Sequence, residues 1–177
     1  MTVKVYGEGA PEAAREAKER LQALDALWSA TSEGSDVARL NSGAGEAVAL
    51  APETMRLLRL SEVVREETKG ALDVTLLPLL KLWGFSGGVH RVPTAEEIEA
   101  ARALTGAGKL KIDEAAGTAQ LEKGSGVELG AVAKGYAGEL VAARLKSLGV
   151  RSALLDLGGN IETVGTREDG TPWRVGL

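Results

Sequence analysis

The segment Glu128–Glu139, with the sequence ELGAVAKGYAGE, constrains this chain more than any other, because it joins an apolar stretch to a long amphipathic helix. The amides at a helix N-terminus lack intrahelical partners and carry a partial positive charge, so this position suits anions. Lys134 is unfavourable in such a first turn unless an anion joins it. The segment therefore predicts an anion-binding site that includes Lys134. The alternative is that its glycines make close helix–sheet contacts and that Lys134 is a surface residue.

Hydrophobic spacing elsewhere predicts helices and strands without a regular β-α-β order. We expect helices over residues 11–29, 35–41, 52 to at least 64, 76–82, 94–104 and 131–148. We expect strands over residues 3–6, 47–50, 109–112, 118–121, 152–157 and 171–177. This order predicts an α+β fold with mixed or antiparallel sheets and packed helices, and we treat residues 1–177 as one domain.

The last expected strand, Thr171–Leu177, has no later strand in the sequence to pair with. We therefore expect these residues to belong to the N-terminal portion of a larger domain. An exposed strand edge tends to pair with another chain. A homo-oligomer formed through this strand is a further expectation.

Charge and residue usage exclude several classes of function. The formal net charge is −4, and no basic patch is interleaved with aromatic residues, which argues against nucleic-acid binding. The chain has no cysteine, so it has no disulfide, thiolate metal site or cysteine nucleophile. No stretch has the pattern of a signal peptide, a lipid-attachment site or a membrane span.

The only histidine, His90, follows two glycines and precedes a helix start, so we expect it on the surface. Without a second histidine or a cysteine, a transition-metal site is not expected, and no Ser–His–Asp arrangement is convincing. The remaining chemistry uses oxygen ligands: carboxylates and carbonyls that suit magnesium, with a lysine for phosphate.

Two further segments combine polar groups with apolar surroundings. In Gly70–Thr75, Asp73 either caps the short helix that follows or binds a polar ligand together with the nearby main chain. In Leu157–Asn160, a glycine pair ends a strand, and the segment is either a turn or a loop that faces a ligand.

Four segments taken in order resemble the ApbE family, the flavin transferases that use FAD to attach FMN to a protein threonine. They are Ser35–Asn41 (SDVARLN), Gly70–Thr75 (GALDVT) continuing to Leu82–Phe85 (LWGF), Glu128–Glu139, and Ala153–Ile161 (ALLDLGGNI). The closing stretch, Asp169–Leu177, fits the same pattern. Together they span nearly the whole chain.

The resemblance implies an α+β, T-fold-related architecture with FAD between its sheets. It also implies magnesium-assisted cleavage of FAD, with AMP released and FMN passed to a threonine hydroxyl of an acceptor flavoprotein. By position, Ala71, Leu72 and Asp73 would contact FAD, and Glu128 and Lys134 would hold it. The main-chain carbonyl of Ala131 would be a magnesium ligand. The family also implies a location in the bacterial periplasm or cell envelope.

The sequence departs from the family pattern at several positions. Thr31 replaces a usual aromatic residue, Leu72 a usual Phe, and Glu128 a usual Asp. The family pattern also continues past Leu177 to an Asp and a Thr that bind magnesium. Three functions follow as hypotheses: an FAD:protein FMN transferase, an FAD-binding module without turnover, and a ligand-free structural or oligomerisation domain.

Overall fold

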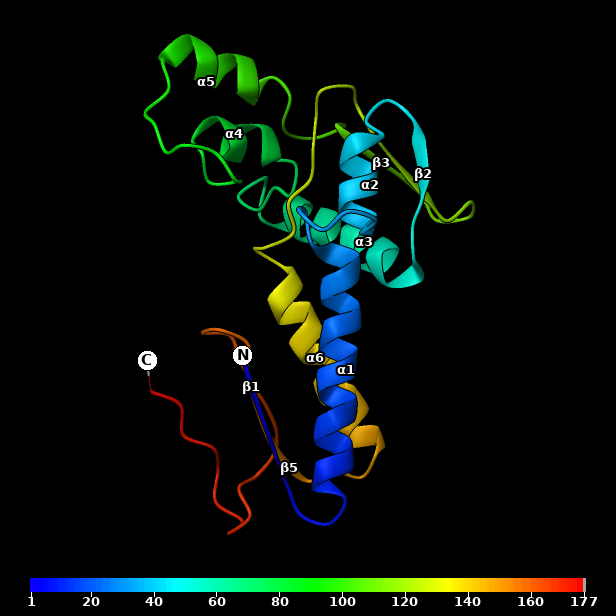
Figure 1. The fold of residues 1–177 in the computed structure, drawn as a ribbon, viewed down its shortest axis with the longest axis vertical. Helices are drawn as coiled ribbons and strands as arrows, with labels where there is room; N and C mark the ends of the chain where they lie inside the picture. Colours follow the sequence, from blue (N-terminus) through cyan, green and yellow to red (C-terminus); the bar gives the residue numbers. More distant parts are fainter. Residues whose placement is uncertain (177) are drawn as a thin grey trace. The chain divides into compact units, whose positions relative to one another are not determined.

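The computed structural model describes residues 1–176 and divides into two compact units (Figure 1). The first unit contains Met1–Asp25 and the chain from Val132 onward, and the second contains Ala26–Ala131. Each unit has a three-stranded sheet in which all neighbouring strands are antiparallel. The predicted α+β class is thereby confirmed.

The first unit packs helices on a sheet with the strand order β1-β5-β6. Its strands are β1 (Thr2–Tyr6), β5 (Ser152–Asp156) and β6 (Ile161–Gly165), and its helices are most of α1 (Ala10–Trp28) and α6 (Ala133–Ser147). Figure 1 shows α1 and α6 side by side, and their buried residues share one apolar core with the sheet. The core consists of Ala13, Ala17, Val141, Ala142, Leu145, Ala153, Leu155, Leu157 and Val164.

Gly138 shows why α6 can approach this sheet closely. A Cβ atom at Gly138 would lie 3.3 Å from Cδ1 of Leu157 and 3.4 Å from Cβ of Glu162. The close helix–sheet contact that we gave as the alternative for the glycines is therefore present at this position. Gly135, by contrast, has open space where its Cβ would be.

The second unit holds a sheet with the strand order β2-β4-β3 and four complete helices. Its elements are α2 (Asp36–Ser42), β2 (Ala47–Ala49), α3 (Pro52–Glu67), α4 (Leu77–Leu82), α5 (Ala95–Arg102), β3 (Leu110–Asp113) and β4 (Thr118–Leu121). In the register, Val48 and Ile112 both pair with Ala119 of the central strand β4. The expected hairpin of β3 and β4 is confirmed.

Local signals at the helix starts were also predicted correctly. The hydroxyl of Ser35 accepts a hydrogen bond from the amide of Ala38 and so caps α2. Thr94 and Glu97 form the expected reciprocal capping box at α5. Pro52 occupies the start of α3, where its missing N–H costs nothing.

The end of the chain differs from the prediction. Residues 171–176 form no strand, and Leu177 lies outside the described residues. Pro172 has no N–H for a sheet ladder, and the segment is instead attached through Trp173. Its indole N–H donates to the carbonyl of Val164 at 3.4 Å, and its ring lies 6.0 Å from that of Tyr6. The expected strand is wrong for residues 171–176, and an oligomer formed through this segment stays a prediction.

The third strand of this sheet is β6, which the sequence pattern did not predict. It pairs with β5 across a turn in which Asp156 Oδ1 accepts hydrogen bonds from the amides of Gly158 and Gly159, at 3.0 and 3.1 Å. The turn expected at residues 157–160 is therefore present, and a ligand contact of this segment stays a prediction.

Among residues 1–176, no helix combines the length and the apolar character that crossing a bilayer requires.

Candidate functional site

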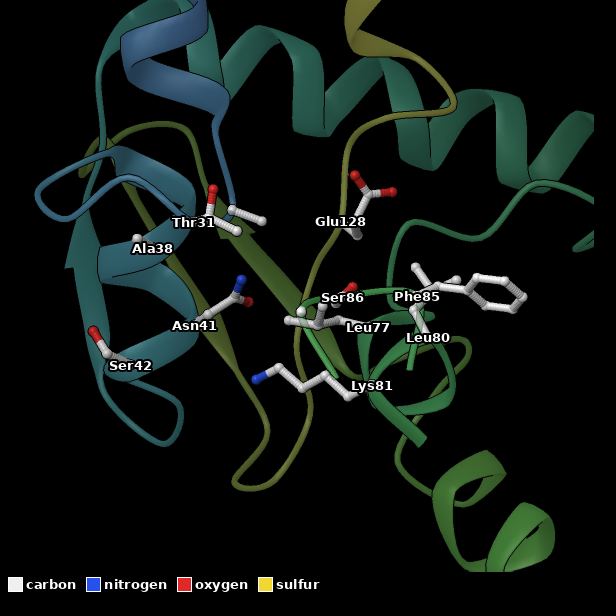
Figure 2. Close-up of a pocket in the computed structure, with 12 residues that line it drawn as sticks. Thr31, Ala38, Asn41, Ser42, Leu77, Leu80, Lys81, Phe85, Ser86 and Glu128 are labelled. Atoms are coloured by element: carbon white, nitrogen blue, oxygen red, sulfur yellow. The ribbon is translucent and has the colours of Figure 1, made fainter. Parts of the chain in front are cut away.

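A cleft of about 730 Å³ opens within the second unit (Figure 2). One wall is formed by α2 and the loop before it, the other by α4 and the loop after it, and Glu128 enters from the strand-like segment that follows β4. Its lining residues are Ala30, Thr31, Ala38, Asn41, Ser42, Leu77, Leu80, Lys81, Phe85, Ser86, Gly87 and Glu128. Ligand pockets commonly have volumes of about 300–1,000 Å³, so a small-molecule ligand fits this cleft.

The cleft has one acidic and one basic residue among its described lining residues, Glu128 and Lys81. Figure 2 shows the amino group of Lys81 directed toward the side of α2, where Asn41 and Ser42 lie. Lys81 and Glu128 form no ion pair with each other or with other residues among 1–176. Both charges are therefore available to a ligand.

The main chain around Glu128 is fixed by hydrogen bonds on two sides. The Glu128 amide donates to the carbonyl of Val74 at 2.8 Å. On the other side, the Asn41 side chain donates to the carbonyl of Val127 at 2.9 Å and accepts from its amide at 2.7 Å. The side chain of Glu128 is half-buried, and its Oε1 accepts the amide of Gly130 at 2.8 Å.

Two glycines next to Glu128 allow this close packing. A Cβ atom on Gly126 would lie 2.8 Å from Cδ2 of Leu77 and 3.3 Å from Oδ1 of Asn41. A Cβ atom on Gly130 would lie 2.8 Å from Oε1 of Glu128 itself. Any side chain at either position would therefore displace a group that lines the cleft.

Ala71, Leu72 and Asp73 lie directly before the segment that bonds to Glu128, but they are not among the described residues that line this cleft. Asp73 Oδ1 accepts from the amide and the hydroxyl of Thr75, at 2.8 and 2.6 Å. The Thr75 hydroxyl oxygen in turn accepts the amide of Gly106 at 2.8 Å. Asp73 thus stabilises the turn before α4.

The alternative in which Asp73 caps α4 is wrong. The N-cap of α4 is Leu76, which makes no side-chain capping bond. A contact between Asp73 and a ligand stays a prediction.

Ala131 and Lys134 belong to different units. Ala131 is the last residue of the second unit and is exposed. Lys134 is exposed in the first turn of α6, and α6 has neither an N-cap side-chain bond nor an acidic residue in that turn. The local chemistry that predicted an anion at this N-terminus is therefore present.

Asn41 and Lys81 line the cleft but were not predicted from the sequence. Both lie in segments that carried the family resemblance, but neither received a role there. Their own local pattern gave no signal: Asn41 is the second-last residue of the short helix α2, and Lys81 lies near the end of the short apolar helix α4. The position of Asn41 in the cleft becomes apparent only in the folded structure, where its side chain hydrogen-bonds to Val127, 86 positions later in the sequence.

The described residues contain no group of three or more His, Cys, Asp or Glu side chains that would hold a metal ion. His90 is exposed, as predicted, and its ring meets that of Phe85 edge-on at 5.3 Å.

Comparison with known proteins identifies the family. The model of the ApbE family matches residues 1–177. The chain belongs to the ApbE family. Three of the segments on which the resemblance was based contribute residues to the cleft in Figure 2.

Relatives and solved structures agree with this assignment. The FAD:protein FMN transferase of Vibrio cholerae serotype O1 is 32% identical over 160 residues, which cover 89% of this chain and 48% of the relative. That of Salmonella typhimurium is 32% identical over 184 residues, covering 99% and 53%. The apo crystal structure of Pseudomonas stutzeri flavinyl transferase ApbE superposes with a TM-score of 0.87 at 36% identity, covering 98% of this chain and 56% of that one. The flavin transferase ApbE from Vibrio cholerae superposes with a TM-score of 0.89 at 30% identity, covering 99% and 59%.

The chain spans about half the length of the curated ApbE relatives that it matches.

Proposed function

We propose that this chain acts in the transfer of FMN from FAD to a threonine hydroxyl of an acceptor protein, with release of AMP. The proposal rests on one observation: a chain of the ApbE family has a cleft that Glu128 lines. In the proposed reaction, the threonine oxygen forms a bond to the phosphorus of the FMN half. The bond between that phosphorus and the bridging oxygen breaks, AMP leaves with the bridging oxygen, and the hydroxyl proton passes to solvent.

The two charges in the cleft suit different parts of FAD. A carboxylate only accepts hydrogen bonds, so Glu128 would bind N–H or O–H groups of the ligand and not its phosphates. Lys81 carries only donors and is the basic residue among the described lining residues, so it would face acceptors or negative charge. The apolar walls from Leu77 and Leu80 would cover ring surface and exclude water.

Further residues complete the proposal by their position in the family pattern. We assign Ala71, Leu72 and Asp73 to FAD contacts, together with Glu128 and Lys134. The exposed Lys134 at an uncapped helix start supports a role beside an anion, because both the lysine and the free amides attract negative charge.

Magnesium is part of the proposal, with the Ala131 carbonyl as a ligand. A main-chain carbonyl is an oxygen ligand of the kind that suits magnesium, and this ion usually keeps several waters and takes its other ligands from carboxylates and substrate phosphates. The lack of a larger ligand cluster among residues 1–176 is compatible with that mode of binding. When bound, the ion would neutralise charge on the diphosphate.

The test is flavin transfer by the purified full chain. The chain is incubated with FAD, magnesium chloride and an acceptor protein that the Vibrio cholerae FAD:protein FMN transferase modifies. We expect the acceptor to gain one covalent FMN, measured by intact mass, and an equal amount of AMP to appear. Omission of magnesium should abolish both.

Variants connect the activity to the cleft. Glu128→Ala should weaken FAD binding at least about tenfold, since a hydrogen bond to a charged group contributes about 1.5–3 kcal/mol. Glu122→Ala is the matched control, because Glu122 is an exposed carboxylate that pairs with Lys109 outside the cleft. FAD binding without AMP release would instead indicate a binding module. If the chain binds no FAD at all, the remaining hypothesis is a structural or oligomerisation domain.

A location in the periplasm or cell envelope belongs to the same proposal. Fractionation of cells that express the native gene, followed by immunoblotting, tests it.

A further inference from the structure

Asn41 makes a two-bond contact with the main chain of a single distant residue. Its Nδ2 donates to the carbonyl oxygen of Val127 at 2.9 Å, and its Oδ1 accepts the amide of Val127 at 2.7 Å. A carboxamide is required for this pattern, because it offers a donor and an acceptor side by side. An aspartate would lose the donor, and a leucine would lose both groups.

This contact ties α2 to the residue immediately before Glu128. The next amide along the chain, that of Glu128, donates to Val74 on the opposite side. Consecutive residues are thus held from two directions, by Asn41 and by the segment before α4. A Cβ atom on Gly126 would lie 3.3 Å from Oδ1 of Asn41, so a side chain at this position would crowd the Asn41 amide.

Asn41 and Glu128 also line the same cleft (Figure 2). Val127 is fully buried, whereas Glu128 is half-buried and is one of the residues that line the cleft. Because one side chain fixes the backbone from which another projects, the position of the Glu128 carboxylate depends on the Asn41 amide.

We propose that Asn41 is a positioning residue for Glu128, and that ligand recognition by this carboxylate requires the two hydrogen bonds to Val127. The identity of the ligand as FAD rests on the proposed function. The role of Asn41 in fixing the main chain at Val127, which we call the clamp, does not. Asn41 acts here through Glu128, and not as a catalytic residue.

A double-mutant cycle tests the proposal. FAD affinity is measured by calorimetry for the full chain and for Asn41→Leu, Glu128→Ala and the double variant. We expect Asn41→Leu to weaken binding about tenfold, as loss of an outer partner of a ligand-binding residue commonly does. The double variant should bind no more weakly than Glu128→Ala alone, because Asn41 has no further effect once its target carboxylate is absent.

Gln120→Leu is the matched control. Gln120 also donates from a side-chain amide to a distant main-chain carbonyl, that of Gly45 at 2.7 Å, but it lies outside this cleft. It should leave FAD affinity unchanged, alone or combined with Glu128→Ala. Additive effects of Asn41→Leu and Glu128→Ala on FAD affinity would overturn the proposal.

A second measurement separates this proposal from the proposed function. Amide hydrogen exchange, followed by NMR without any ligand, should show lost protection at the Val127 amide in Asn41→Leu. In Asn41→Asp, which keeps the acceptor, this protection should be largely retained, and that variant is available if the leucine variant does not fold. The Glu128 carboxyl signal should shift in both variants and not in Gln120→Leu. If the wild-type chain binds no FAD, the proposed function fails, while unchanged exchange at Val127 or an unchanged Glu128 signal would contradict the clamp.

Discussion

The two walls of the cleft are held in place by different physical means. The α2 wall depends on buried side-chain polar groups: Asp36 is 4% exposed, and its Oδ2 accepts the amide of Ala51 at 2.7 Å and the hydroxyl of Thr54 at 2.6 Å. Arg39 donates to the other carboxylate oxygen at 2.5 Å and to the carbonyl of Ala49. This wall is anchored to α3 and β2 through side chains.

The α4 wall depends on backbone conformation. Helix α4 ends in a Schellman motif, in which the Phe85 amide donates to Leu80 and the Gly84 amide to Lys81, at 2.8 and 3.0 Å. The loop beyond it leaves large apolar side chains in solvent, with Phe85 64% and Val89 87% exposed. The α2 wall should therefore be destabilised when a buried hydrogen-bond partner is removed, and the α4 wall when a side chain is introduced at a position that only glycine tolerates.

The largest effect is expected at Asp36. Asp36→Ala leaves the buried Thr54 hydroxyl and the Ala51 amide without their acceptor, which should lower the free energy of unfolding by about 3 kcal/mol. Urea denaturation measures this change. Adding Thr54→Val to Asp36→Ala should recover part of the lost free energy of unfolding, because no buried hydroxyl is then left without a hydrogen-bond partner. A loss that the second substitution does not reduce would show that this hydrogen bond does not stabilise the wall.

A smaller effect is expected at Gly84, on the other wall. Its φ is +82°, and an added Cβ would lie 2.4 Å from the carbonyl oxygen of Val89. Gly84→Ala should lower the free energy of unfolding by about 2 kcal/mol, from left-handed strain together with displacement of the loop.

Gly87 supplies the matched control for this substitution. Its φ is +81°, but nothing lies within 4 Å of a Cβ built there. Gly87→Ala should therefore cost only the conformational strain, about 1 kcal/mol. The free energy of unfolding of both variants is measured by urea denaturation. If Gly84→Ala and Gly87→Ala lower it equally, the loop at Val89 moves away from the added Cβ without a cost in stability.

The smallest effect concerns Glu97, at the surface beyond the α4 wall. Hydrogen bonds from the Arg91 guanidinium, at 2.9 Å to each carboxylate oxygen, and from the Thr94 amide lower the pKa of Glu97 from 4.5 to about 2. A lowered pKa in the folded state stabilises the fold above pH 4.5, and this contribution is lost as the pH falls toward 2. The difference in urea midpoint between the wild type and Glu97→Gln should therefore shrink over this range. A difference that is independent of pH would refute the assignment.

Elements with local signals were predictable from the sequence. The capping box at Thr94 and the β3–β4 hairpin depend on residues within a few positions of each other. Strand β6 was missed, because Ile161–Gly165 is short and becomes a strand only by pairing with β5. Residues 171–176 have a strand-like pattern but pair with no strand among residues 1–176, so the same kind of pattern led to a wrong prediction there.

The cleft was predictable only in part. Glu128 was found because the family pattern drew attention to it, and the structure places it among the lining residues. Asn41 and Lys81 were missed, because their function arises from distant segments that come together. Thr31, noted as a departure from the family, also lines the cleft. Contacts of Ala71, Leu72, Asp73, Ala131 and Lys134 with a ligand remain predictions.

The glycines on either side of Glu128 have a consequence for how this chain can vary. Every missense change in a glycine codon adds at least a Cβ, and at Gly126 and Gly130 that atom would meet Leu77 and the Glu128 carboxylate, each at 2.8 Å. The carboxylate can therefore be disturbed by single-nucleotide changes that leave its own codon intact. A substitution at either glycine would act at the cleft, although neither residue has a side chain with which to bind a ligand.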